Sequence, residues 1–175
     1  MLCVLHKKVT VGAGEIIFRP LHFHTTQKQG GYTMTPKLIT HFIGKPQLDF
    51  MMELHIDAED GDNTILDHLA AVTETISTMP KTYETDGQGD KALVFLHYFS
   101  SGSDWWITER DCEEDQLQAF GFVCLNGDRE MAELGYIDIE ELGRAGVELD
   151  LYWQVKPLSD VKRELGLPHQ AARIH

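Results

Sequence analysis

Three side chains in the second half of the chain could carry acid–base chemistry: Glu109, Glu133 and Tyr136. Glu109 stands four residues after Trp105, so on a strand the two side chains point to the same face. A carboxyl group beside an aromatic ring can have a raised pKa and serve as a general acid, which makes these three residues a candidate catalytic set. The alternative is structural, because carboxylates at such positions more often hold turns or pair across strands.

A second candidate is a metal site built on His22 and His24. Residues at i and i+2 of a strand share a face, and two histidines so placed can chelate zinc if a third ligand converges on them. His6, His41 and His55 could supply it. No HExxH motif and no paired-cysteine motif accompanies the pair, so surface or partly buried histidines are the alternative and we expect no cofactor.

The charge is large and unevenly distributed. The 175 residues include 15 Lys and Arg against 28 Asp and Glu, a formal net charge of −13. Residues 1–52 hold six basic and two acidic side chains, a net +4, which leaves −17 for the remainder. A strongly negative protein binds nucleic-acid phosphates poorly, so we expect no direct nucleic-acid binding by the acidic part.

The acidic residues downstream form a candidate binding surface for a protein partner. Residues 104–150 contain 14 carboxylates but only three arginines. A folded array of this kind can imitate nucleic-acid phosphates and occupy the basic groove of a DNA- or RNA-handling protein, whereas the alternative is a solvated surface that aids solubility. The predicted partner-binding residues, with one aromatic anchor, are Asp111, Glu113, Glu114, Asp115, Asp128, Glu130 and Trp105.

The elements that position these residues differ between the two parts of the chain. Short strands are expected at Met1–Leu5 and Glu15–Phe23, and strands or short helices at 37–43 and 47–56. The best-defined helix begins at Asn63 or Thr64, carries apolar residues at helical spacing and ends before Pro80. The loop Thr82–Asp90 predicts a boundary, with residues 1–79 as an N-terminal extension and 80–175 as a second domain, or one continuous domain.

Beyond that loop the pattern predicts antiparallel hairpins. Ser100–Ser103 should join strands at 92–99 and 105–108, and Asn126-Gly127 should join strands at 119–125 and 129–137. Further expected elements are a short helix capped by Asp138, a strand at 148–155 and a last helix from Pro157 to about Leu165. The fold class predicted is α+β, with an antiparallel sheet of short strands and a few covering helices.

Residues 80–162 resemble a family of uncharacterised small domains encoded on bacterial plasmids, integrative elements and phages. The resemblance lies in the order and spacing of several short motifs, which are Pro80–Thr85, Val94–Phe99, Asp104–Glu109, Phe120–Val123, Glu133–Ile137, Glu140–Leu142 and Asp150–Trp153. It implies an accessory role on a mobile element, where neighbouring genes often counter host restriction or CRISPR defence. The family carries no established activity to transfer.

These observations favour an acidic, non-enzymatic protein that binds and inhibits a host nucleic-acid-handling defence complex, of anti-CRISPR or antirestriction type. A small enzyme or metal protein built on the residues above is the alternative, and a third possibility is nucleic-acid binding by the +4 N-terminal part with Tyr32. No apolar run approaches the roughly 18 residues that span a bilayer, and the start lacks signal-peptide order, so we expect a cytoplasmic protein. Pairing of an exposed edge strand would give a homodimer.

Overall fold

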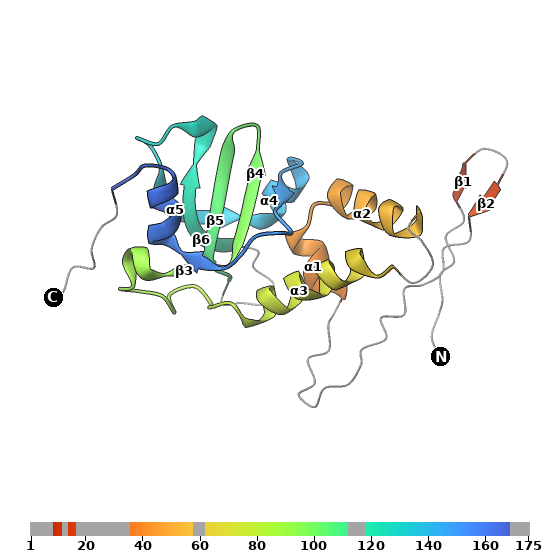
Figure 1. The fold of residues 1–175 in the computed structure, drawn as a ribbon, viewed down its shortest axis with the longest axis horizontal. Coiled ribbons are helices and arrows are strands. Elements are labelled where there is room, and N and C mark those ends of the chain that lie inside the picture. Colours follow the sequence, from red (N-terminus) through yellow and green to blue (C-terminus); the bar gives the residue numbers. More distant parts are fainter. Residues whose placement is uncertain (1–8, 12–13, 17–35, 58–61, 112–117, 169–175) are drawn as a thin grey trace, which may run out of the picture. The chain divides into compact units, whose positions relative to one another are not determined.

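The computed structural model describes residues 9–11, 14–16, 36–57, 62–111 and 118–168 (Figure 1). The chain divides into two compact units, Met1–Thr33 and Met34–His175. In the first unit, β1 (Val9–Val11) pairs antiparallel with β2 (Gly14–Ile16). The predicted strand at 1–5 and most of the one at 15–23 lie outside the described residues.

The second unit is built on a five-stranded sheet with the order β7-β6-β5-β4-β8, and each of its strand pairs is antiparallel. The predicted α+β class is therefore confirmed. A separate antiparallel pair consists of β3 (Leu93–Val94) and β9 (Lys156–Pro157). The strands of the main sheet are β4 (Leu96–Ser100), β5 (Ser103–Glu109), β6 (Gln118–Cys124), β7 (Glu133–Asp138) and β8 (Glu148–Leu149).

Four helices supply apolar side chains to one face of this sheet. They are α1 (Pro36–Phe42), α2 (Lys45–Asp57), α3 (Thr64–Thr78) and α4 (Ile139–Arg144). Ile43, Ile76 and Ile107 of β5 are buried together in this core, and Ile76 follows the helical spacing predicted for α3. The hydroxyl of Tyr98 on β4 donates a hydrogen bond of 2.7 Å to the carbonyl of Phe42, which ties the sheet to α1.

The opposite face of the sheet carries a smaller core under α5 (Leu158–Glu164). Leu158 and Val161 of this helix pack with Trp106 and Phe122. Because successive strand residues point to opposite faces, Trp105 instead packs against the core under the four helices. The two consecutive tryptophans therefore contribute to different cores.

Turn and cap chemistry follows the sequence at three places. Ser101 and Gly102 both have positive φ (46° and 83°), as a two-residue hairpin turn requires, and Asn126 and Gly127 also have positive φ (53° and 70°). The Asp138 carboxylate accepts the backbone N–H of Glu141 at 2.9 Å and caps α4 as predicted.

Several predicted boundaries differ from the structure. The segment 37–56 is helical, as α1 and α2. The strand expected at 148–155 ends at Leu149, because the Asp150 carboxylate accepts the Tyr152 N–H and the chain turns. The strand expected from 129 begins only at Glu133, because Asp128 accepts the N–H groups of Glu130 and Met131 and holds a turn there.

The 92–99 segment is also divided, since 93–94 pairs with β9 while 96–100 joins the main sheet. The two compact units are divided at 33/34, and α1–α3 share a core with the sheet within the second unit. In the described part of the chain, no helix has both the length and the apolar character needed to cross a membrane.

Candidate interaction surface

The clearest surface feature is a run of carboxylates along β7 and its two ends, which we call the acidic edge. Only two arginines, Arg129 and Arg144, accompany it along the same stretch. Within the described residues, none of these carboxylates forms an ion pair. The acidic edge consists of six exposed residues: Asp128, Glu130, Glu133, Asp138, Glu140 and Glu141.

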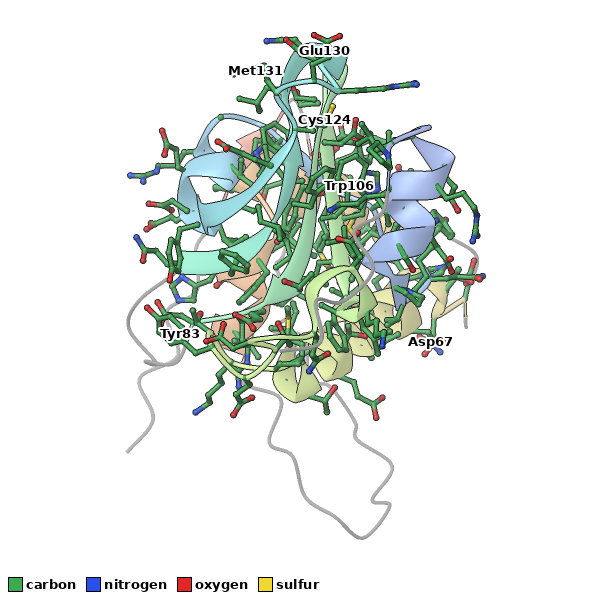
Figure 2. All side chains as sticks on the ribbon, turned by 90° about the vertical axis from the view of Figure 1, so that its left-hand side faces the viewer. Asp67, Tyr83, Trp106, Cys124, Glu130 and Met131 are labelled. Carbon is green, nitrogen blue, oxygen red and sulfur yellow. The ribbon has the colours of Figure 1, made fainter. Side chains whose placement is uncertain are left out.

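Apolar side chains lie among these carboxylates. Met131 is 76% exposed, Tyr136 55% and Leu134 41%. Figure 2 shows Glu130 and Met131 together at one end of the sheet, with Tyr83 at the other end. The exposed surface of β7 therefore combines negative charge at its ends with large apolar side chains in its middle, a composition that suits protein binding.

Tyr83 lies beside Tyr136, and the two exposed tyrosines form a small patch. The Tyr136 hydroxyl donates to the Tyr83 hydroxyl at 3.0 Å, and this hydrogen bond raises the pKa of Tyr136. Tyr83 is 63% exposed and has a φ of 78°, which is unusual for a bulky residue. The Tyr136 ring also packs edge-on against Phe120, with centroids 5.4 Å apart.

Glu109 holds Tyr83 in this conformation. It is 3% exposed, and its two carboxylate oxygens accept the backbone N–H of Tyr83 at 2.9 Å, the N–H of Thr85 at 2.7 Å and the hydroxyl of Thr85. Both oxygens are thus occupied inside the chain. Glu109 therefore organises the loop after Pro80.

The structure does not assemble the predicted catalytic set. Glu133 and Tyr136 are three residues apart on β7, so their side chains point to opposite faces of the sheet. Glu109 and Tyr136 each hydrogen-bond to Tyr83 and not to one another, although the negative charge of Glu109 adds to the rise in the pKa of Tyr136. Burial raises the pKa of the Cys124 thiol, which keeps it protonated and weakly nucleophilic.

The predicted partner-binding residues lie in different places. Asp128 and Glu130 belong to the acidic edge and follow the C-terminal end of β6. Asp111 follows β5, next to the N-terminal end of β6, and the seven residues of β6 separate the two positions by about 20 Å. Trp105 is half-buried toward the helices and does not lie on that edge. Glu113, Glu114 and Asp115 lie outside the described residues.

The metal prediction concerns His22 and His24, which also lie outside the described residues. Where the structure does describe side chains, no three His, Cys, Asp or Glu residues are grouped so as to hold a metal ion. His41 and His55, two of the suggested third ligands, are among the residues searched.

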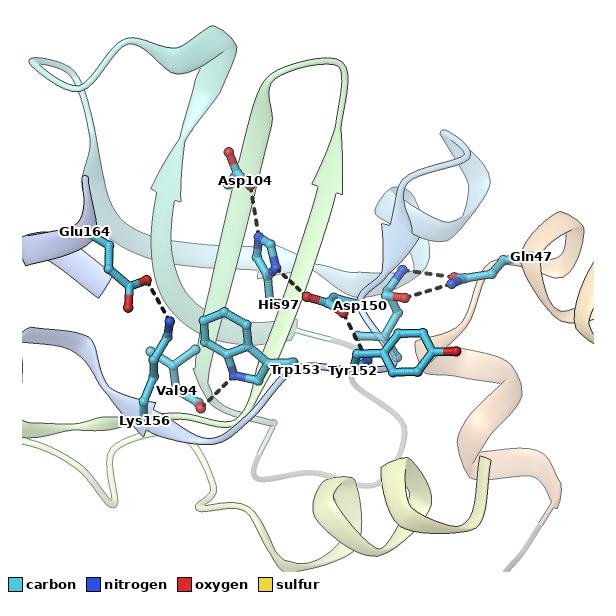
Figure 3. Close-up of polar contacts among 10 residues, drawn as sticks. Gln47, Val94, His97, Asp104, Asp150, Tyr152, Trp153, Lys156 and Glu164 are labelled. Carbon is cyan, nitrogen blue, oxygen red and sulfur yellow. Dashed lines mark hydrogen bonds and ion pairs between the residues drawn. The ribbon is translucent and has the colours of Figure 1, made fainter. Parts of the chain in front are cut away.

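A second polar cluster, not anticipated from the sequence, centres on His97 (Figure 3). Its Nε2 lies 2.9 Å from Asp104 and its Nδ1 lies 3.2 Å from Asp150. The imidazole stacks on Trp106, with centroids 5.5 Å apart, and contacts Trp153 at 4.9 Å. Asp150 is 53 residues from His97, so no local pattern could have paired them.

The chemistry of this cluster is structural. A general base needs one ring nitrogen free to face the reactant, and here each nitrogen faces a carboxylate. Asp150 also accepts the Tyr152 N–H and donates its own N–H to the His97 carbonyl at 2.8 Å. The cluster therefore fixes the turn after β8 onto β4.

Next to this turn, the outer edge of β8 is covered by a side chain from α2. The Gln47 amide donates to the carbonyl of Leu149 at 2.7 Å and accepts its N–H at 2.9 Å (Figure 3). These two bonds reproduce the pairing that a further strand would make. The sheet is closed at this edge.

Comparisons of the chain with protein-family models, with curated proteins and with solved structures found no match.

Proposed function

We propose that the protein binds the basic surface of a host nucleic-acid-handling defence complex, of restriction or CRISPR type, and inhibits it in the cytoplasm. The observation that carries this proposal is the acidic edge, which has six exposed carboxylates and only two arginines in the same stretch of chain. Three exposed apolar side chains lie among the carboxylates. Such an edge attracts a basic groove by long-range electrostatics, and the apolar side chains then add contact area that excludes water.

Binding is favoured over catalysis because the polar residues with the most defined geometry are already satisfied within the chain. Glu109 accepts three internal hydrogen bonds, and both nitrogens of His97 face carboxylates. The acidic-edge residues, in contrast, are all exposed, although Asp128 and Asp138 also accept N–H groups of their own turn and helix cap. The resemblance to mobile-element domains supports the class of partner, because such elements must evade host defence.

The test is affinity capture from a bacterial host lysate with a charge-reversed variant, Glu130→Lys/Glu133→Lys/Glu140→Lys. None of these three side chains caps a helix or accepts a hydrogen bond within the described residues. The matched control, Glu53→Lys/Asp57→Lys/Glu74→Lys, makes the same change in net charge at exposed positions of α2 and α3.

We expect wild type and the control variant to retain a nuclease, CRISPR or restriction subunit at about 150 mM salt, and the acidic-edge variant to retain about tenfold less. Nucleic-acid cleavage by the purified partner should then fall when wild type is added. Equal retention by all three proteins, or retention only of proteins that do not handle nucleic acids, would contradict the proposal.

A further inference from the structure

β7 is an edge strand whose outward backbone groups can be identified from the sheet register. Antiparallel residues alternate between facing one neighbour and facing the other. The His97 carbonyl accepts from Asp150, so His97 faces away from β5. The next residue, Tyr98, therefore faces β5, and the same alternation can be followed through the printed pairs of β5 with β6 and of β6 with β7. On β7, it leaves Leu134 and Tyr136 with their backbone N–H and C=O groups pointing outward from the sheet.

The same counting places the backbone groups of Leu149 outward on β8, where Gln47 bonds to both. This agreement supports the assignment on β7. Within the described residues, nothing bonds to the outward groups of Leu134 and Tyr136. An exposed edge of this kind is a template for another strand, and proteins usually cover, shorten or twist such edges.

The chemistry around β7 defines what would pair with it. Glu133 and Asp138 are the first and last residues of the strand, and Glu130 and Glu140 lie beyond them, so basic side chains are favoured near both ends of an added segment. Leu134 and Tyr136 point to one face, where apolar side chains of an added strand would pack beside them. Acidic segments are disfavoured by repulsion.

We propose that β7 docks an extended segment of the partner, in which basic residues alternate with apolar ones, by addition as a strand to the sheet edge. This rests on the proposed function and specifies its binding mode. The N–H and C=O groups of Leu134 and Tyr136 offer four hydrogen bonds to the added strand. Backbone pairing of this type gives affinity, and the neighbouring side chains give specificity.

The test separates backbone pairing from charge by comparing Leu134→Pro with Leu134→Ala in the full chain. Proline removes the outward N–H but no ladder hydrogen bond, since proline is tolerated at edge positions whose N–H faces solvent. Alanine removes the same side chain and keeps the N–H, and neither change alters the acidic edge. Circular dichroism and urea unfolding establish that both variants are folded.

The probe is a nine-residue peptide of alternating Lys and Val, with a second peptide of the same sequence that is N-methylated at each Val. We expect the first peptide to bind wild type and Leu134→Ala, and to bind Leu134→Pro at least about tenfold more weakly. The N-methylated peptide should bind wild type about tenfold more weakly than the unmodified one. Amide hydrogen exchange at Leu134 and Tyr136 should slow when the unmodified peptide is added, which remains measurable if Leu134→Pro does not fold.

Equal binding of both peptides to wild type, unchanged exchange at Leu134 and Tyr136, or absence of binding would overturn strand addition while leaving the lysate result to decide the proposed function. If the peptide binds in the expected way but the lysate yields no nucleic-acid-handling protein, β7 is a docking strand and the proposed function is wrong. The two failures are therefore distinguishable.

Discussion

The two edges of the five-stranded sheet differ in length, cover and charge. β8 has two residues, and Gln47 occupies its outward backbone groups. β7 has six residues, bears exposed Leu134 and Tyr136, and runs between carboxylates. Proteins protect sheet edges by a cover or by charge, and the two edges here show one device each: Gln47 covers β8, whereas no described residue bonds to the outward backbone groups of Leu134 and Tyr136 on β7, which carboxylates border. The proposed strand addition uses the edge that is protected by charge.

The largest expected effect comes from Glu109→Gln, which should disrupt the β7 side of this comparison. The amide replaces one of two acceptor oxygens with a donor that faces N–H groups, and Tyr83 loses support for its positive φ. We expect the free energy of unfolding in urea to fall by about 3 kcal/mol. Capture of the partner should also weaken, because Tyr83 no longer holds Tyr136.

Glu84→Gln is the matched control for Glu109→Gln. Glu84 is exposed in the same loop and accepts one N–H, from Lys81 at 2.8 Å. We expect the free energy of unfolding of Glu84→Gln to stay within about 0.5 kcal/mol of the wild-type value. If both substitutions cost the same, Glu109 does not have the role assigned to it.

The next effect, from Gln47→Met, should open the covered edge. Methionine keeps most of the side-chain volume but leaves the N–H and C=O of Leu149, a buried residue, without their partner. We expect the free energy of unfolding in urea to fall by about 2 kcal/mol. The variant should also self-associate as its concentration rises, which sedimentation measures.

Gln47→Glu serves as the control for that substitution, because it keeps an acceptor for the Leu149 N–H and places a carboxylate at the edge, which should suppress self-association. Unchanged stability in Gln47→Met would mean that water replaces the Gln47 amide without cost, and the difference between the two edges would then be one of length alone.

The smallest effect is on the pH dependence of the free energy of unfolding, which should differ between Tyr98, on the strand next to β8, and Tyr136 on β7. Burial raises the pKa of Tyr98, which pairs with Leu149, far above its ordinary value of 10. Above pH 10 the unfolded chain loses this proton while the native state keeps it, so stability falls as the pH rises. The slope contributed by Tyr98 is at most about 1.4 kcal/mol per pH unit.

Tyr98→Phe should be less stable at neutral pH, because the Phe42 carbonyl loses its hydrogen bond, yet its unfolding free energy should fall less steeply between pH 10 and 11. Tyr136→Phe should change that slope far less, since Tyr136 is exposed. Urea unfolding at several alkaline pH values measures both. Parallel slopes for wild type and Tyr98→Phe would be the contrary result.

Local sequence signals predicted the local parts of the fold well. Helical spacing predicted α3, and the positive-φ preference of Gly102 and Asn126 predicted the hairpin connections. The Asp138 cap was also correct, because a cap depends on residues three apart. Where a side chain redirected the backbone, as Asp150 does after β8, the predicted strand was too long.

The candidate site was predictable only in part. Charge counting identified Asp128 and Glu130, but not that β7 is an edge strand, because strand order is decided by long-range pairing. Glu109 and Tyr136 were selected as chemically interesting, yet their roles in a loop and in a tyrosine pair depend on Tyr83, which lies 26 residues before Glu109.

The α+β class, the hairpins and the excess of negative charge follow from local features of the sequence, since periodicity, turn chemistry and composition are properties of neighbouring residues. Which edge of the sheet is covered by a side chain depends on the folded structure. That outcome depends on Gln47 reaching Leu149 across 102 positions of the chain, and such a pairing is specified by the packing of α2 against the sheet, which no local pattern encodes.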